Sequence, residues 1–390
     1  GCRQQWFAPR APENDNGEPN DDQDDDDGNK QKKTQRSQRL WRMVLLATFC
    51  GVIPGVFALN AYLEFGVHAL IPVRFQYLGH SAAHWQAEIL PMRTILMIGG
   101  PHRGGTTILW KCIREHPDIS NFGDTTDTAA PLSEGIFMQE VYPHFGLGKE
   151  PIGGHNNRHP WKSFHGGLGQ YALQQEAKIH LTEKSELITE ENQAKLLNRF
   201  GYFWNMSKPV LLEKSPPNAV ISRFLQALIN LNVQSHESQV NSNDVARFLF
   251  ITRHPLANAL AHRAWPFCRR MPLIRIVENW VRVNEYMLQD MDHLRHVKLL
   301  KMEEFQTDPD RYLRDVFEWI GLDPDKAANR TTLVHQNTNQ KYKKRYCKWL
   351  EDHRDEHAQL ETMFGDRIRR IGYEIQEWSQ CASNRHPSEE

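Results

Sequence analysis

The feature that most constrains this chain is a short apolar segment that leads directly into a glycine-rich turn. Residues 94–98 (Thr-Ile-Leu-Met-Ile) are typical of a buried strand, the turn Gly-Gly-Pro-His-Arg-Gly-Gly-Thr-Thr follows at 99–107, and Ile108 to His116 indicate a helix. Such a turn directs free backbone N–H groups and the positive end of a helix dipole at one point. It therefore predicts an anion-binding loop in an α/β fold, the alternative being a tight turn without a ligand.

The turn departs from the ATP-binding pattern G-x4-G-K-[ST] at one position. Gly100 and Gly105 have the required spacing, but Thr106 stands where that pattern has lysine. A cation lies inside the turn instead, at Arg103. We therefore expect a phosphate-bearing donor other than ATP, and a nucleotide kinase or NTPase is the alternative enzyme class.

The 390 residues allow one large α/β domain with extensions, and the formal net charge of −1 provides no general attraction to nucleic acid. Charge is nevertheless unevenly placed. Residues 13–27 carry nine acidic and no basic side chains, whereas every charged residue from Lys30 to Arg42 is basic. The acidic stretch has few apolar residues to bury, so residues 1–42 are expected to form a disordered tail.

A membrane anchor is predicted at residues 43–63. These 21 residues contain no charge, and a helix needs about 20 residues to cross a bilayer. Basic residues precede the segment and Glu64 follows it, which places the N-terminus in the cytosol. We expect a type II protein with a stem at 64–92, a lumenal domain at 93–375 and a tail at 376–390; a buried soluble helix is the alternative.

The predicted lumenal part has features of an oxidising, glycosylating compartment. Two sequons begin at Asn205 and Asn329. One or two disulfides are possible among Cys112, Cys268, Cys347 and Cys381, but the pairing cannot be read from spacing. No metal site is predicted, because no cysteine pair has ligand spacing and the histidine-rich residues 155–165 favour a surface loop.

Further apolar runs predict strands at 209–215, 246–252 and 296–301. Helices are expected at 217–231, from about 256, at 273–294 and at 309–320. Strands that alternate with helices favour a parallel sheet with right-handed crossovers. The predicted fold class is therefore α/β, a P-loop-like parallel sheet flanked by helices, with an N-terminal transmembrane helix.

Three cationic residues lie at or just past the carboxyl ends of three of the predicted strands: Arg103, Lys214 and Arg253. The carboxyl ends of parallel strands meet at one edge of a sheet, where ligands bind. A multiply anionic ligand is therefore expected at this edge.

Four segments, taken in order, resemble those of sulfotransferases that use 3′-phosphoadenosine 5′-phosphosulfate (PAPS). The turn at 101–107 is similar to the phosphosulfate loop of the membrane-bound tyrosylprotein and carbohydrate enzymes. Residues 213–217 (Glu-Lys-Ser-Pro-Pro) resemble a motif of the heparan sulfate enzymes, Arg253-His-Pro resembles the 3′-phosphate segment, and 301–309 resembles a later strand and loop. The resemblance covers roughly residues 94–375.

The resemblance implies a role for each of these groups. Arg103 and the amides and hydroxyls of 104–107 would bind the 5′-phosphosulfate, Lys214 would stabilise the leaving phosphate, and Arg253 would bind the 3′-phosphate. No metal is required. The implied donor-binding positions are Arg103, Gly104, Gly105, Thr106, Thr107, Arg253, Ala261, Lys343 and Lys344.

One departure concerns Ala261, which stands where many sulfotransferases have a serine that contacts the 3′-phosphate. The 3′-phosphate would then have fewer contacts, or the missing contact would come from Asn258, His262 or the basic run 341–345. That run is equally consistent with a solvated basic face. A non-catalytic nucleotide-binding membrane protein is therefore a further alternative.

The acceptor base has two carboxylate candidates. Glu134-Gly-Ile-Phe is similar to the segment that supplies the base in heparan sulfate sulfotransferases, and a carboxylate there would deprotonate the attacking acceptor. Asp124 has the offset from Arg103 that the catalytic glutamate has in tyrosylprotein sulfotransferases. We favour Glu134, with His102 and His155 as less favoured candidates.

The resemblance implies a Golgi sulfotransferase that acts on a hydroxyl or amine of a glycan, a protein tyrosine or a glycolipid. The acceptor itself cannot be read from the chain. Its determinants are expected in the loops 120–169 and 268–272.

Overall fold

The computed structural model describes residues 79–128, 130–145, 167–231, 244–266, 268–327 and 338–381. The chain divides into two units, Gly1–Pro72 and Val73–Glu390, and all described residues belong to the second. The expected tail and anchor, His155 and the sequon at Asn329 lie outside the described residues. Within the described ranges, no helix combines the length and the apolar character that crossing a bilayer requires.

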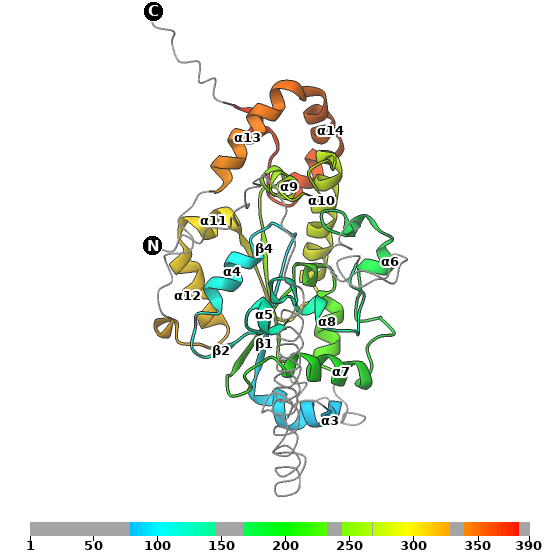
Figure 1. The fold of residues 1–390 in the computed structure, drawn as a ribbon, viewed down its shortest axis with the longest axis vertical. Helices are drawn as coiled ribbons and strands as arrows, with labels where there is room; N and C mark the ends of the chain where they lie inside the picture. The colour runs from blue at the N-terminus through cyan, green and yellow to red at the C-terminus, as the bar shows by residue number, and fades with distance from the viewer. Residues whose placement is uncertain are drawn as a thin grey trace, which may run out of the picture. The chain divides into compact units, whose positions relative to one another are not determined.

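Five parallel strands form one sheet in the order β2-β3-β1-β4-β5 (Figure 1). The predicted parallel sheet flanked by helices is confirmed. The two-residue strand β2 was not predicted, because two residues show no periodicity. The strands are β1 (Thr94–Gly99), β2 (Ile119–Ser120), β3 (Val210–Lys214), β4 (Ala246–Thr252) and β5 (Val297–Lys301).

The central strand β1 is apolar on both sides because both faces of the sheet are covered. Side chains alternate between the faces of a strand, so Ile95 and Met97 join one hydrophobic cluster while Leu96 and Ile98 join another. All four side chains are fully buried. Helices α8 (Ser222–Ile229) and α10 (Leu273–Met291) contribute to the first cluster. Helices α4 (Thr106–Ile113), α11 (Met302–Thr307) and α12 (Pro309–Trp319) contribute to the second (Figure 1).

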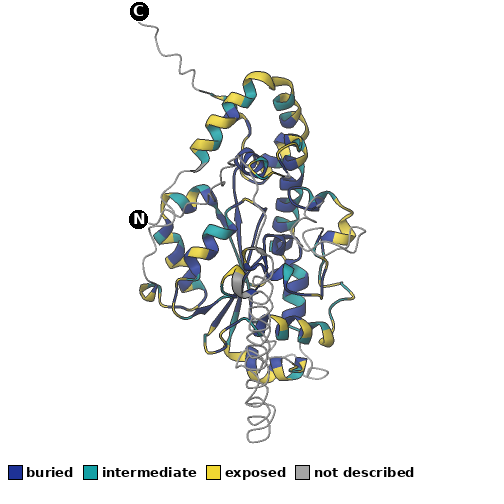
Figure 2. Cartoon of the chain, in the orientation of Figure 1, coloured by how far each residue is buried: buried dark blue, intermediate teal, exposed yellow. Residues whose placement is uncertain are grey.

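A third cluster lies beyond the carboxyl ends of the strands. It joins α9 (Pro255–Arg263) and α10 to α13 (Thr338–Asp352), α14 (Arg354–Arg370) and α15 (Gln376–Ser379). Trp280 and Tyr346 are fully buried in it, and Figure 2 shows a buried interior beneath the exposed outer faces of these helices. A disulfide between Cys347 and Cys381 ties α13 to the chain after α15, whereas Cys112 and Cys268 are free and buried.

Several boundaries differ from the sequence predictions. The helix expected at 108–116 spans Thr106–Ile113, and the one expected at 217–231 begins with a 3-10 turn because two successive prolines lack N–H donors. The basic run 341–345 lies within α13. The remaining elements are α3 (Ala82–His84), the π-helix η2 (Trp85–Ile89), η3 (Leu90–Met92), α5 (Thr125–Thr128), η4 (Pro131–Ser133), η5 (Gly135–Phe137), η7 (Tyr171–Leu173), α6 (Glu176–Ile179), α7 (Glu190–Gly201), η8 (Pro216–Val220) and η9 (Pro324–Lys326).

Candidate active site

The glycine-rich turn lies where β1 meets α4, and its glycines are required because the backbone closely approaches a strand and a helix. Gly100 has φ +148°, and a Cβ atom there would lie 2.1 Å from the Ile251 carbonyl oxygen on β4. Gly105 has φ +118°, and its Cβ would lie 2.7 Å from Sδ of Met302. The loop backbone is therefore held directly against β4 and α11.

The turn presents the start of α4 as an anion site. Gly104 N–H donates to the Pro101 carbonyl at 2.8 Å, so this amide shapes the turn. The amides at the start of α4, around Thr106 and Thr107, have no carbonyl of a preceding turn to bind, as at any helix N-terminus. Thr106 is buried and Thr107 half-buried. The first turn of α4, with its dipole, is thus available to a phosphate or sulfate group.

Arg103 projects from this turn with a left-handed backbone, at φ +63°. Its side chain is exposed, and its guanidinium carbon lies 4.6 Å from the centre of the Trp265 ring. Cation–π contact with a tryptophan restricts where the guanidinium lies. Trp265 was not predicted as a site residue, because it belongs to a loop without a recognisable pattern.

Lys214 ends β3 and forms a buried ion pair with Glu134. Its Nζ atom donates to Oε1 of Glu134 at 2.6 Å, and the two side chains are 0% and 5% exposed. Burial raises the pKa of Glu134, and the charge of Lys214 partly opposes that rise. The structure therefore brings one predicted carboxylate directly against the predicted lysine.

The other candidate carboxylate, Asp124, lies elsewhere. Its side chain is 73% exposed and pairs with Arg114 at 3.2 Å. Arg114 follows the last residue of α4, while the glycine-rich turn precedes the first. The length of α4, about 12 Å, therefore separates the Arg114 backbone from that turn.

Two neighbours of Lys214 in the sequence hold the backbone beside Glu134. Glu213 Oε1 accepts the Gly135 N–H at 3.0 Å, and Ser215 Oγ accepts the Ile136 N–H at 3.0 Å. Burial raises the pKa of Glu213 to about 7, although the hydrogen bonds from Ser215 and Asn218 act to lower it. The Glu-Lys-Ser motif contained all three residues, but only the lysine had been assigned a role.

Arg253 follows β4, and His254 separates it from the first residue of α9, at the same edge of the sheet. Its Nε donates to Oδ1 of Asn339 at 2.7 Å, and its guanidinium lies 5.0 Å from the Tyr342 ring centre. Burial lowers the pKa of Arg253, and the nearby charge of Arg103 acts in the same direction. Arg103 follows β1 and Arg253 follows the neighbouring strand β4, so the two arginines stand at the same edge of the sheet.

The later basic residues occupy two environments on α13. Lys343 is half-buried and lines a cavity of about 330 Å³ together with His254, Asn339 and Trp378. Lys344 is exposed. The cavity adjoins Arg253 through Asn339, so of the two lysines it is Lys343 that lies near the predicted 3′-phosphate position.

Two polar residues near Ala261, Asn258 and His262, form hydrogen bonds that lead to the glycine-rich turn. Ala261 is buried in α9, where Asn258 Nδ2 donates to the His102 carbonyl at 2.7 Å. The ring of His262 in turn donates through Nδ1 to the Asn258 carbonyl at 2.9 Å. Asn258 therefore supports the backbone of the glycine-rich turn.

Several buried polar atoms beside this turn have no hydrogen-bond partner in the part of the chain that the structure describes. They are Nδ1 of His102, the hydroxyl of Tyr171, Oδ1 of Asn258 and Nε2 of His262. Burial lowers the pKa of His102 and lowers that of His262 to about 4, so both rings are neutral at pH 7. Such unpaired groups cost free energy and are characteristic of functional sites.

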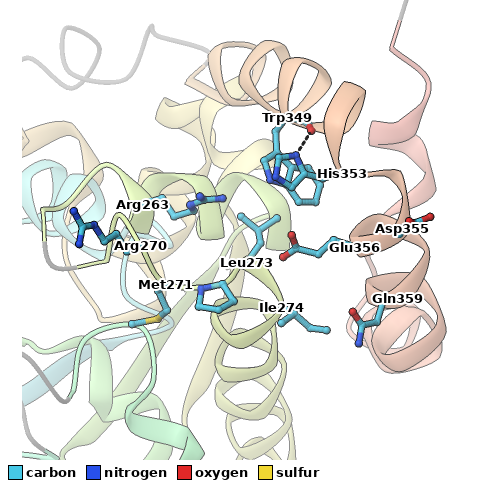
Figure 3. A pocket seen from close by; sticks show the side chains of 11 residues that line it. Arg263, Arg270, Met271, Leu273, Ile274, Trp349, His353, Asp355, Glu356 and Gln359 are labelled. Carbon is cyan, nitrogen blue, oxygen red and sulfur yellow. Dashed lines mark hydrogen bonds between the residues drawn. The ribbon is translucent and has the colours of Figure 1, made fainter.

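A second cleft of about 540 Å³ lies between the start of α10 and the junction of α13 with α14 (Figure 3). The rings of Trp349 and His353 stack at 4.7 Å on one wall, and residues 270–274 form another. This second wall includes part of the 268–272 loop in which acceptor determinants were expected. Among the described residues, no cluster of three or more His, Cys, Asp or Glu is arranged to hold a metal.

No protein-family model matches the chain, and no curated protein matches it. Among solved structures, it is similar to a sulfotransferase from Alicyclobacillus acidocaldarius, with 16% identity over 73% of this chain and 98% of that one and a TM-score of 0.36. A sulfotransferase from Mycobacterium tuberculosis is 14% identical over 75% of this chain and 90% of that one, with a TM-score of 0.35. The sulfotransferase domain of the Synechococcus olefin synthase is 16% identical over 64% and 82%, with a TM-score of 0.33.

Proposed function

We propose that this protein is a sulfotransferase that moves the sulfuryl group of PAPS to an acceptor hydroxyl or amine. The observation that carries the proposal is the buried pair of Lys214 and Glu134 at the sheet edge where the glycine-rich turn and Arg253 also lie. The positively charged side chains can bind the anionic sulfuryl donor, and the buried carboxylate beside them can serve as the base for the acceptor. ATP chemistry is less well supported, because Thr106 replaces the lysine that reaches the outer phosphates.

In the proposed reaction, the acceptor oxygen or nitrogen attacks the sulfur of PAPS. The new bond to sulfur forms as the bond between sulfur and the bridging oxygen of the 5′-phosphosulfate breaks. The proton of the acceptor passes to the carboxylate of Glu134. The electron pair of the broken bond stays on the leaving 5′-phosphate, so negative charge accumulates there.

The cations of the site oppose that accumulating charge. An ammonium group has three N–H donors, so Lys214 can bind Glu134 and the bridging oxygen together. Arg103 and the first-turn amides of α4 would bind the phosphosulfate, while Arg253 and Lys343 would bind the 3′-phosphate. Groups that are already fixed before charge develops lower the barrier without reorganising.

We further propose that the domain acts in the lumen of the Golgi, behind a single-pass anchor at 43–63. The disulfide between Cys347 and Cys381 supports an oxidising compartment. Asn205 and Ser207 of the first sequon are exposed, and the Ser207 hydroxyl donates to the Asn205 side-chain oxygen at 2.8 Å. The acceptor would be a glycan, a protein tyrosine or a glycolipid, with the cleft of Figure 3 binding parts of it remote from the reacting atom.

The direct test uses the full chain in detergent. Binding of 3′-phosphoadenosine 5′-phosphate (PAP) is measured by calorimetry, and transfer from radiolabelled PAPS is measured across glycan, peptide and lipid acceptors. Binding with transfer to one class supports the proposal. Binding without PAP release from PAPS would favour the non-catalytic alternative that Ala261 suggests, whereas Mg²⁺-dependent turnover of ATP would favour a kinase or NTPase.

A further inference from the structure

The chain segment that carries Glu134 is attached to β3 through its backbone as well as through the ion pair. Gly135 N–H donates to Glu213 and Ile136 N–H donates to Ser215, each at 3.0 Å. These two acceptors flank Lys214 in the sequence. The end of β3 thus binds the backbone of the segment through the two residues that flank Lys214.

The two acceptors are themselves fixed. The Ser215 hydroxyl donates to Oε1 of Glu213 at 2.6 Å, and the second oxygen of Glu213 accepts from Nδ2 of Asn218. Asn218 also donates to the Ile98 carbonyl on β1 at 3.0 Å. The segment is therefore connected to two adjacent strands immediately before the glycine-rich turn, and Glu213 and Ser215 are completely buried.

The approach of the segment to Glu213 leaves no space for a side chain at position 135. A Cβ atom on Gly135 would lie 2.7 Å from Oε1 of Glu213 and 3.0 Å from Cζ of Phe200. Neighbouring side chains of a strand point to opposite faces, so Glu213 and Lys214 leave β3 in opposite directions. The segment therefore crosses the end of β3: its backbone donates a hydrogen bond to Glu213, and its Glu134 side chain pairs with Lys214.

We propose that Glu213 and Ser215 are positioning residues that hold Glu134 at the acceptor. The inference rests on the proposed function, in which Glu134 takes the acceptor proton. A general base acts only within hydrogen-bond reach of the proton that it removes. Neither Glu213 nor Ser215 needs to touch a substrate for this role, since each acts through the backbone next to Glu134.

The test variant is Ser215→Ala, which removes the acceptor of the Ile136 N–H and leaves Glu134 and Lys214 in place. We expect kcat for PAP release from PAPS to fall about 10- to 100-fold, the cost of a base displaced by about 1 Å. The probe reaction is PAPS turnover by the full chain, with water or a screened compound as the acceptor. The Kd for PAP should stay unchanged, and Ser215→Thr should restore kcat because it keeps the hydroxyl.

Ser222→Ala is the matched control. Ser222 is also completely buried on a helix of the same domain, and its hydroxyl donates to a carboxylate oxygen of Asp290 at 2.9 Å. This control should lower the melting temperature with little effect on kcat. If Ser215→Ala likewise lowers only the melting temperature and keeps the wild-type kcat, Ser215 has a structural role and the inference is overturned.

Glu213→Gln provides a second variant in case Ser215→Ala does not fold. The amide keeps one oxygen for Gly135 but sets an NH₂ group against the donor Asn218, so kcat should fall with PAP affinity unchanged. An unchanged kcat in Glu213→Gln at pH 8, where Glu213 of the parent is ionised, would also overturn the inference. A wild-type chain that binds PAP but never releases it from PAPS would instead reject the proposed function, and this inference with it.

Discussion

Nζ of Lys214 lies 2.6 Å from Oε1 of Glu134, although 80 positions separate the two residues in the chain. Both groups are buried, so each charge depends on the other in place of water. Removing one partner of a buried ion pair leaves an uncompensated charge, which is usually far more costly than replacing both. The ion pair can therefore be tested by measuring the free energy of unfolding as well as the catalytic rate.

Lys214→Met should destabilise the fold by about 3–5 kcal/mol and abolish sulfuryl transfer. The reason is that Glu134 stays buried without its cation. Urea unfolding and the PAPS assay measure the two effects. The double variant Lys214→Met with Glu134→Gln should regain much of the stability but none of the activity, and additive losses in the double variant would contradict the coupling.

The stability of the fold should depend on the ionisation of Glu213. Its pKa is raised from 4.5 to about 7 in the folded protein. Between pH 4.5 and 7, the folded chain therefore keeps a proton that the unfolded chain releases. The resulting contribution to the free energy of unfolding is fully present below pH 4.5 and is lost as the pH rises through 7. The loss is at most about 3 kcal/mol.

Glu213→Gln should remove this pH dependence. Unfolding free energies from urea titrations at pH 5, 6, 7 and 8 would show a shallower decline in the variant than in the parent protein. Parallel curves for the two proteins would mean that Glu213 does not titrate in this range.

Arg253→Ala should weaken PAP binding by about 10- to 100-fold, because a charge-assisted hydrogen bond to phosphate is lost. Arg103→Ala should have a smaller effect, since Arg103 is exposed to solvent. Calorimetric titration with PAP measures both. Arg311→Ala, an exposed arginine on α12, is the charge-matched control and should bind PAP like the parent; equal affinity in Arg253→Ala would show that the 3′-phosphate site is elsewhere.

Loss of the disulfide in Cys347→Ser with Cys381→Ser should lower the free energy of unfolding by about 2–4 kcal/mol, since it closes a long loop of the unfolded chain. It should also weaken PAP binding, because α13 carries the Asn339 and Tyr342 contacts to Arg253. Unfolding and PAP titrations measure the two effects. Cys112 and Cys268 are free thiols, and burial raises the pKa of each to about 11, so among the described cysteines a reductant should alter only the Cys347–Cys381 bond.

The amino-acid sequence alone determined the layers of the domain and the loop at its centre. Apolar runs define the strands because both faces of the sheet are covered, and glycines at 100 and 105 are needed where the backbone closes against β4 and α11. Arg103, Lys214 and Arg253 could be placed at one edge because each lies at or just past the end of a strand, and parallel strands end together.

Only the tertiary structure decided how residues distant in the chain combine. Glu134 and Asp124 belong to the same loop-rich stretch, and a resemblance of the segment at Glu134 favoured that residue without showing which side chain it would contact. The positions of β3 and α4 bring Glu134 to Lys214 and leave Asp124 with Arg114. The contact of Asn339 with Arg253 and the pairing of Cys347 with Cys381 likewise depend on how α13 packs over α9. Periodicity and spacing report the burial of each element, whereas contacts between elements follow from strand order and helix packing.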